Sequence, residues 1–184
     1  MRIFYFPTFN TILVDVVAWV IIHLSIGYWC SRLPLSWFDP QKWLYQVFPW
    51  EKGGEIYQRL FRVRSWKKFI PSGGSLYKDT FSLQRLSSYH IEHLEHWLSE
   101  SCRAEFCHWV MMAPGLLFFL WNNVELAWGM VVYAVANNIV PIIMQRFNRP
   151  RVRRILEHLR KQAVAEPFLY ADQNPETAYL NSYC

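Results

Sequence analysis

Three apolar runs, at about residues 11–30, 107–121 and 126–144, constrain this chain more than any other feature of its sequence. Each run gathers apolar side chains almost without charge, instead of spreading them as an amphipathic stripe. The first run is long enough to cross the hydrocarbon layer of a bilayer, which is about 30 Å thick. It also contains Asp15 and His23, so it is more than an apolar anchor. The pattern predicts an all-α integral membrane protein with about three transmembrane helices.

The charges around these runs predict how the helices are oriented. Lys and Arg are concentrated in the segment 31–106 and after the third run, whereas the tip at 122–125 carries neither. Because positively charged loops stay in the cytosol, we expect a multi-pass protein of the plasma membrane with its N-terminus outside and its C-terminus in the cytosol. Residues 1–161 then form a single membrane domain, in which 31–106 is a cytosolic, amphipathic interfacial segment. Residues 162–184 form a C-terminal tail.

The charge balance also bears on the partners of the protein. The chain has 19 Lys and Arg against 14 Asp and Glu, for a formal net charge of +5. A positive charge of this kind suits anionic lipid headgroups or a phosphate-bearing substrate. No nucleic-acid-binding motif accompanies it, so nucleic acid is not an expected partner.

Residues 88–109 predict a helix with two different faces, because successive side chains are separated by 100°. The polar face carries His90, His93, His96, Glu100, Arg103 and His108. Glu105 falls on the apolar face, where a carboxylate needs either a partner or a raised pKa. Two interpretations stay open, namely an ion pair with a basic residue of the tail and a chemical role.

The histidines at 90, 93 and 96 suggest a metal-dependent membrane oxidase as one alternative function. Their spacing of three residues drifts around a helix, and no HExxH signature joins them. We therefore expect no metal site.

Three blocks of sequence carry a resemblance to a known family. They are FPWEKGGEIY at 48–57 with VRSWK at 63–67, ESCRAEFCHW at 100–109, and NIVP at 138–141 with QRFNRPR at 145–151. The second block resembles the ExxRAExxHW pattern, and the third the QRYNRPR stretch, of the glycosyl-4,4'-diaponeurosporenoate acyltransferases. These small membrane enzymes add a fatty acyl group to a carotenoid glucoside in staphyloxanthin-type pigment synthesis.

The resemblance implies a membrane-bound O-acyltransferase that moves a fatty acyl group onto a hydroxyl of a glycosylated carotenoid or another membrane glycolipid. The implied partners are the lipid bilayer, the glycosylated acceptor and an acyl donor, which is acyl-CoA, an acyl carrier protein or an acyl-phosphate. No cofactor is expected. A non-catalytic membrane adaptor of a lipid or pigment pathway is the alternative from a different class.

Acyl transfer to a hydroxyl requires a base, stabilisation of an oxyanion and contacts to the activated donor. His108 lies at the polar–apolar boundary of the helix and is the predicted general base, and Glu105 and Glu100 complete the predicted catalytic group. Glu100 is also spaced for an i,i+3 ion pair with Arg103. The sequence has no GxSxG elbow and no Cys/His motif, so direct attack is favoured over an acyl-enzyme.

The predicted substrate-binding residues come from all three blocks. Guanidinium groups suit phosphate oxygens, although the same arginines also fit positive-inside anchoring. Asn138 and Gln145 share one face of the third run, where amides can hydrogen-bond a sugar or an ester carbonyl. Glu51 and Lys52 precede a Gly-Gly turn that is expected to close the site. The full set is Arg103, Glu51, Lys52, Trp66, Lys67, Asn138, Gln145, Arg146, Asn148, Arg149 and Arg151.

Overall fold

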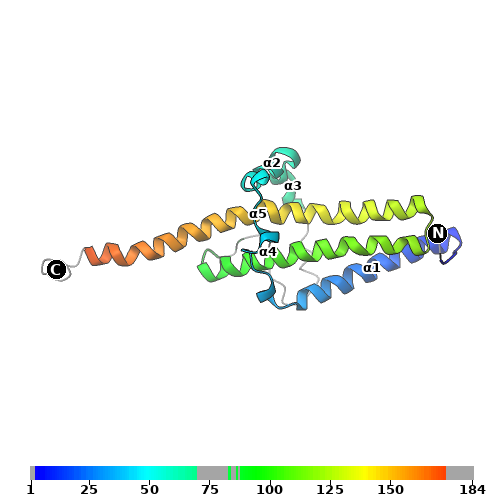
Figure 1. Ribbon diagram of the computed structural model, residues 1–184, viewed down its shortest axis with the longest axis horizontal. Helices are drawn as coiled ribbons and strands as arrows, with labels where there is room; N and C mark the ends of the chain where they lie inside the picture. The colour runs from blue at the N-terminus through cyan, green and yellow to red at the C-terminus, as the bar shows by residue number, and fades with distance from the viewer. Residues whose placement is uncertain (1–2, 70–82, 84–85, 87, 173–184) are drawn as a thin grey trace.

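In the part of the chain that the structure describes, every regular element is a helix. That part comprises residues 3–69, 83, 86 and 88–172 of a computed structural model. Figure 1 shows three long helices side by side, α1 (Thr8–Arg32), α4 (Ile91–Met112) and α5 (Val124–Asp172). The expected all-α class is confirmed for these residues, and α4 covers most of the helix expected over 88–109.

α1 contains the first expected span. It begins directly after Pro7 and ends before Leu33, which is extended because Pro34 follows it. Its apolar window has a mean hydropathy of 1.9, and 11% of that window is buried within the chain. Most of its apolar side chains therefore face away from the protein, as they do on a helix that lipid surrounds.

The expected second span, 107–121, is divided between two elements. Its first part is the end of α4, and its second part is the 3-10 helix η6 (Ala113–Leu120). Pro114 lies in the first turn of η6 and has no N–H to continue the α-helical hydrogen bonds. Within the described ranges, two helices are long and apolar enough to cross a membrane, α1 and Val124–Val164 of α5, so the structure does not confirm a third span.

The expected third span, 126–144, is the first part of α5. The side chain of Asn123 caps this helix, since the N–H of Leu126 donates to its Oδ1 at 2.8 Å. The apolar window within Val124–Val164 has a mean hydropathy of 1.7, and 28% of it is buried. Pro141 does not break α5, which continues beyond the expected span as one helix.

α4 and η6 pair with α5 as the expected helical hairpin (Figure 1). The tip of this hairpin lies at the same end as the N-terminus, where the N–H of Ile3 donates to the carbonyl of Leu120 at 2.7 Å. Asp15 of α1 is buried there, and its Oδ1 accepts hydrogen bonds from Trp121 Nε1 at 2.7 Å and Asn122 Nδ2 at 2.8 Å. Asp15 therefore holds α1 against the tip.

Short helices lie between α1 and α4 in the sequence. They are η1 (Leu35–Trp37), η2 (Trp43–Tyr45), η3 (Pro49–Gly54), α2 (Glu55–Phe61), α3 (Val63–Trp66) and η4 (Lys67–Phe69). Among them, η3 and α2 pack against α5, whereas η1 packs against α4. Tyr57 and Val63 form a buried cluster with Ile143 and Phe147 of α5. This packing brings the first family-like block next to the third, although Glu51 and Arg146, which contact each other, are 95 residues apart in the sequence.

Candidate functional site

A buried ion network joins α4, α5 and η3. Glu105 of α4 is 0% exposed, and its two carboxylate oxygens lie 2.8 Å from Arg146 Nε and 2.7 Å from Arg149 Nη2. Glu51 of η3 is 1% exposed and lies 2.7 Å from Arg146 Nη1. We refer to Glu51, Glu105, Arg146 and Arg149 as the buried ion network. The ion-pair interpretation of Glu105 is therefore confirmed, and two carboxylates neutralise two guanidinium groups inside the protein.

Backbone carbonyls and a serine take up the remaining N–H groups of both arginines. Arg146 Nη2 donates to the carbonyl of Leu44 at 2.7 Å, and Arg149 Nη1 donates to that of Tyr45 at 3.2 Å. Arg149 also donates to Ser101, to Oγ at 3.3 Å and to the carbonyl at 3.1 Å. Every guanidinium nitrogen of Arg146 and Arg149 thus has a protein acceptor. Their role in substrate binding stays a prediction, whereas their role in holding three elements together is visible in the structure.

Glu51 accepts three hydrogen bonds with its two oxygens. In addition to Arg146, the N–H of Phe48 donates to Oε2 at 2.9 Å and the hydroxyl of Tyr57 donates to Oε1 at 2.5 Å. Burial and then the hydrogen bond to the Glu51 carboxylate raise the pKa of Tyr57 above its ordinary value, which keeps this hydroxyl a donor. Lys52 follows in the sequence with a φ of +48°, and its side chain is exposed instead of joining the network.

Gly54 explains how η3 approaches α5 so closely. Its φ is +85°, and a Cβ added to it lies 3.2 Å from the carbonyl oxygens of both Arg146 and Phe147. Gly53 has a φ of +64°, but a Cβ there meets nothing within 4 Å. The two glycines therefore share the left-handed backbone and differ in the space beside them.

This difference gives a matched pair of substitutions. Gly53→Ala is expected to cost about 1–2 kcal/mol for the left-handed conformation alone. Gly54→Ala carries the same cost and also pushes η3 away from Arg146. The melting temperature of the Gly54→Ala protein in detergent is therefore expected to fall clearly below that of the Gly53→Ala protein. Equal melting temperatures for the two variants contradict the close packing of η3 on α5.

Ser101 and Gln145 form a second polar contact between α4 and α5. The Ser101 hydroxyl donates to Gln145 Oε1 at 2.9 Å, and Ser101 is 0% exposed. Gln145 therefore lies on the same face of α5 as Asn138, as their spacing predicts, and this face meets α4. Since the oxygen of the Gln145 amide is used on Ser101, its N–H groups are the part that can donate to a substrate.

His108 and Asn138 form a third polar contact between the same helices. His108 Nδ1 lies 2.9 Å from Asn138 Oδ1, and Asn138 Nδ2 donates to the carbonyl of Ala134 at 2.9 Å. The bond to Ala134 assigns the nitrogen of this amide, so its oxygen faces the histidine. An amide oxygen only accepts, so Nδ1 of His108 carries the hydrogen and Nε2 has a lone pair. The predicted base thus has the tautomer that a base acting through Nε2 requires.

A second histidine reaches the same region from α1. His23 Nδ1 lies 2.8 Å from the carbonyl of Trp19, and its Nε2 lies 3.4 Å from Asn137 Nδ2. Asn137 precedes Asn138 on α5, so the contact to His23 and the contact to His108 lie at consecutive residues of this helix. We refer to His23, His108, Asn137 and Asn138 as the polar junction. It consists of two polar pairs, one between α1 and α5 and one between α4 and α5.

Glu100 and Arg103 lie on α4, away from the buried ion network. Arg103 Nη2 is 2.7 Å from Glu100 Oε2, so the i,i+3 ion pair expected from their spacing is confirmed. Arg103 Nη1 also donates to the carbonyls of Ser31 at 3.2 Å and Leu33 at 3.4 Å. These carbonyls belong to the C-terminal end of α1, which attracts positive charge. Arg103 therefore ties α4 to the end of α1.

Lys67 and Arg151 form a cationic edge around Phe147. Lys67 Nζ donates to Asn148 Oδ1 at 3.3 Å and lies 5.5 Å from the Phe147 ring, and Arg151 Cζ lies 3.5 Å from the same ring. Burial lowers the pKa of both groups, and so do neighbouring cations, including Arg64. Among the described residues, neither Lys67 nor Arg151 forms an ion pair with a carboxylate. Lys67 and Arg151 are therefore predicted binding residues whose positive charge is not neutralised by an ion pair, unlike that of Arg146 and Arg149.

Trp66 is the remaining member of the predicted set. Its Nε1 donates to the carbonyl of Phe61 at 2.6 Å, and its ring packs beside the cluster that contains Phe147. It therefore stabilises the turn between α2 and α3 and lies next to the cationic edge.

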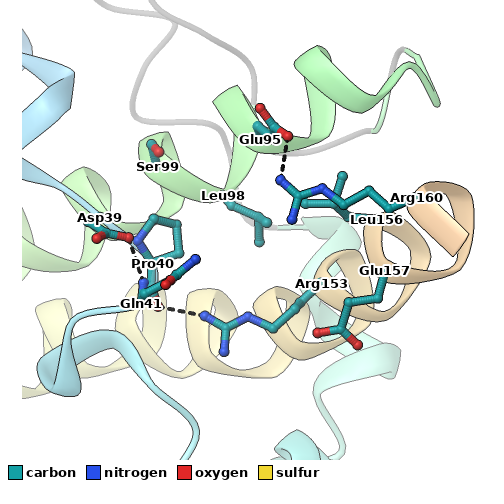
Figure 2. Close-up of a pocket in the computed structure, with 10 residues that line it drawn as sticks. All are labelled: Asp39, Pro40, Gln41, Glu95, Leu98, Ser99, Arg153, Leu156, Glu157 and Arg160. Atoms are coloured by element: carbon teal, nitrogen blue, oxygen red, sulfur yellow. Dashed lines mark hydrogen bonds and ion pairs between the residues drawn. The ribbon is translucent and has the colours of Figure 1, made fainter. Parts of the chain in front are cut away.

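Figure 2 shows a pocket of about 300 Å³ between α4, the second half of α5 and the loop at Asp39. The charged residues that line it are Asp39, Glu95, Arg153, Glu157 and Arg160. Arg160 points toward Glu95 across the pocket, and their side-chain atoms lie 2.6 Å apart. With three carboxylates and two guanidinium groups, the lining does not select an anion. None of the predicted site residues lines this pocket.

Four residues of these sites were missed by the reasoning from sequence, namely Tyr57, Ser101, His23 and Asn137. Ser101 was detectable, because it lies four residues before Glu105 and thus on the same helical face. His23 was noted as a polar residue within an apolar run but was given no role, whereas Tyr57 and Asn137 contribute through contacts between distant segments, for which the sequence carries no local signal. In the described part of the chain, no group of three His, Cys, Asp or Glu side chains is placed to hold a metal ion.

Among its described residues, the chain has two helices of membrane length. A histidine, amide side chains and the buried ion network lie between its long helices. It therefore belongs to the class of small helical proteins with an internal polar site. A profile of the glycosyl-4,4'-diaponeurosporenoate acyltransferase family matches residues 40–158, which include all three sequence blocks. The chain belongs to this family, and it is an acyltransferase.

Individual relatives agree with the family profile. The chain is 31% identical over 146 residues to the glycosyl-4,4'-diaponeurosporenoate acyltransferase of Staphylococcus haemolyticus (strain JCSC1435), which covers 79% of this chain and 82% of the relative. It is 31% identical over 144 residues to the enzyme of the same name from Staphylococcus aureus (strain MRSA252), and this alignment covers 78% of the chain and 87% of the relative. No solved structure matches the chain.

Proposed function

We propose that this protein is a membrane-bound O-acyltransferase that moves a fatty acyl group onto a hydroxyl of a glycosylated carotenoid, such as the glycosyl-4,4'-diaponeurosporenoate for which its relatives are named. A glycosylated membrane lipid is the wider class of acceptor. The observation that carries the proposal is the contact between His108 and Asn138. It holds an imidazole between apolar helices with its Nε2 lone pair available as a base.

In this proposal the chain crosses the membrane three times, with α1, the end of α4 together with η6, and the first part of α5. Two features support it. The N-terminus and the hairpin tip lie at one end, and the arginines of the third block lie toward the other, as the positive-inside rule expects. The N-terminus is then outside, and the buried ion network lies on the cytosolic side of the polar junction.

The reaction proceeds by direct attack. His108 Nε2 takes the proton of the acceptor hydroxyl while the hydroxyl oxygen bonds to the acyl carbon of the donor. The tetrahedral intermediate then collapses, the bond between the acyl carbon and the donor breaks, and the imidazolium returns the proton to the leaving group. Asn138 positions the ring, and the amide N–H groups of Gln145 are the proposed donors to the acyl carbonyl. A covalent acyl-protein trapped with hydroxylamine during turnover contradicts direct attack.

The donor is an activated fatty acyl group that carries a phosphate, as acyl-CoA, acyl carrier protein and acyl-phosphate all do. Arg146 and Arg149 are neutralised by carboxylates, whereas Lys67 and Arg151 are not. We therefore place the phosphate of the donor at Lys67 and Arg151, where an anion relieves the repulsion between neighbouring cations.

This placement predicts a pH dependence. The pKa of Lys67 lies below its ordinary value of 10.5, so its positive charge is lost as the pH rises through that lowered pKa. Since the phosphate needs the charge, the KM for the donor is expected to rise toward alkaline pH. Lys67→Arg is expected to abolish this rise, and Lys67→Gln to raise the KM about 10-fold at neutral pH. Arg59→Gln, an exposed cation on α2, is the control; an unchanged KM in Lys67→Gln contradicts the assignment.

The function itself is tested by giving the full chain, in a membrane, the glycosylated carotenoid and an acyl donor. Mass spectrometry of the extracted pigments is expected to show the acceptor with one added fatty acyl ester. Pigments of a strain that lacks the protein are expected to accumulate the unacylated glycoside. Acylated product at normal levels in that strain contradicts the proposal.

A further inference from the structure

We propose that His23 and Asn137 form a hydrogen-bonding site for the alcohol group of an acceptor that is dissolved in the bilayer and enters sideways between α1 and α5. The inference rests on the proposed membrane acyl transfer and deepens it by naming the acceptor site. His23 lies on α1, before the residues 40–158 that the family profile matches.

The side chain of Asn137 is exposed in the middle of an apolar face. Tyr133, four residues before it on α5, is exposed on the same face, and Val20, three residues before His23, is exposed on α1. An amide on such a surface is unremarkable in water, but within hydrocarbon it has no solvent to hydrogen-bond and its burial is costly. Polar residues inside spans are accordingly rare and tend to be functional. A ligand that supplies hydrogen bonds at this point removes the cost.

The hydrogen-bonding groups present at this point match an alcohol. His23 uses its Nδ1 hydrogen on the carbonyl of Trp19, so its Nε2 has a lone pair. The 3.4 Å between that Nε2 and Asn137 Nδ2 is longer than the usual distance of about 2.9–3.0 Å for an N–H···O bond, so the contact is a long one. A hydroxyl placed between them donates to His23 and accepts from Asn137. A phosphate or carboxylate has no hydrogen for His23.

Because of Pro141, the backbone carbonyl of Asn137 is a further hydrogen-bond acceptor beside the His23–Asn137 pair. Residue 141 has no N–H, so the carbonyl of Asn137 receives no hydrogen bond from it, although α5 continues past this point. A second hydroxyl of a polyhydroxylated acceptor can donate to this carbonyl. The site therefore favours an acceptor with several hydroxyl groups over a simple fatty alcohol.

The site lies next to the proposed base. Asn137 and Asn138 are consecutive, and Asn138 Oδ1 lies 2.9 Å from His108 Nδ1, so the two pairs are one residue apart along α5, with Asn137 exposed and Asn138 buried. His23 is in this view a binding and positioning residue, whereas His108 takes the proton.

The experiment uses the full chain in lipid nanodiscs with two photoreactive probes. One is a long-chain 1,2-diol that carries a diazirine, and the other is its bis-methyl ether, which cannot donate a hydrogen bond. Labelling of the peptides from α1 and α5 is read by mass spectrometry. The diol is expected to label at least about 5-fold more than the ether, as one hydrogen bond implies. Equal labelling by the two probes overturns the proposal.

Variants assign the effect to these residues. His23→Leu and Asn137→Leu are expected to reduce diol labelling to the level of the ether and to raise the KM for the glycosylated acceptor about 5-fold or more. His23→Gln, which keeps a hydrogen-bonding side chain, is expected to retain part of the labelling, and Ile21→Leu on α1 is the matched control. His23→Gln is used to check that substitution at this position leaves the fold native. Native diol labelling together with a native KM in His23→Leu overturns the proposal.

The two proposals can fail separately. His108→Ala is expected to keep the excess labelling by the diol while it loses turnover. Selective labelling without any acyl transfer by the native chain contradicts the proposed function and leaves the alcohol site standing. Acyl transfer with a native KM in His23→Leu contradicts the alcohol site and leaves the proposed function standing.

Discussion

Replacing His108 with alanine is expected to lower kcat for acyl transfer by about 10²–10⁴-fold, the usual contribution of a general base. The physical reason is the tautomer, because the bond from Nδ1 to Asn138 leaves Nε2 as the lone pair that accepts the proton. Asn138→Leu is expected to lower kcat less, since the ring remains but is no longer oriented. The measurement is ester formation per folded molecule, with binding of both substrates checked separately.

A histidine outside the polar junction provides the control. His158 is exposed on the second half of α5, so His158→Ala is expected to keep native kcat. If His108→Ala turns over at the native rate in the same assay, His108 is not the base. Normal product formation in cells that express His108→Ala is the result that the adaptor alternative predicts.

Glu105→Leu is expected to destabilise the protein by about 3–5 kcal/mol, because it leaves Arg146 and Arg149 buried with one carboxylate between them. Glu105→Gln is expected to lower the melting temperature as well, since an amide hydrogen-bonds but does not neutralise. Its kcat per folded molecule is expected to stay near native, because both oxygens of Glu105 are used in ion pairs. Thermal unfolding in detergent and specific activity are the two measurements.

An exposed ion pair between the same two helices is the matched control for charge. Glu95 and Arg160 are 2.6 Å apart, with 45% and 54% of their side chains exposed, so Glu95→Gln is expected to cost less than about 1 kcal/mol. A well-folded Glu105→Gln protein with its kcat reduced more than 100-fold overturns the structural role of Glu105. That result supports instead the chemical role that the sequence left open.

The helices and their order followed from the sequence, because they depend on patterns within short stretches. Apolar runs of membrane length predicted α1 and the first part of α5, and the periodicity of residues 88–109 predicted α4 with its polar face. The i,i+3 pair of Glu100 and Arg103 was predicted for the same reason, since its partners lie one turn apart. The family also followed from sequence, through three blocks whose residues the family profile matches.

The partner of each charged or polar side chain was decided by the tertiary structure. Arg146, Arg149 and Arg151 lie within one short block, yet the first two form ion pairs with Glu51 and Glu105, whereas Arg151 lies near the cations Arg64 and Arg154 and near Glu55 and forms no ion pair with a carboxylate among the described residues. Their residue type and spacing do not distinguish them. An ion pair depends on a separation of about 3 Å and on exclusion of water, and helix packing sets both between residues far apart in the chain.

The same holds for the polar junction. The sequence predicted His108 and Asn138 separately, but their mutual hydrogen bond, and hence the nitrogen on which His108 carries its hydrogen, exists only after α4 packs on α5. His23 contacts Asn137 only because α1 packs against that hairpin, and the sequence of α1 alone shows His23 as a polar residue in an apolar run. Local periodicity determines which residues share a helix face, whereas hydrogen bonds a few ångströms long between helices require the packed fold.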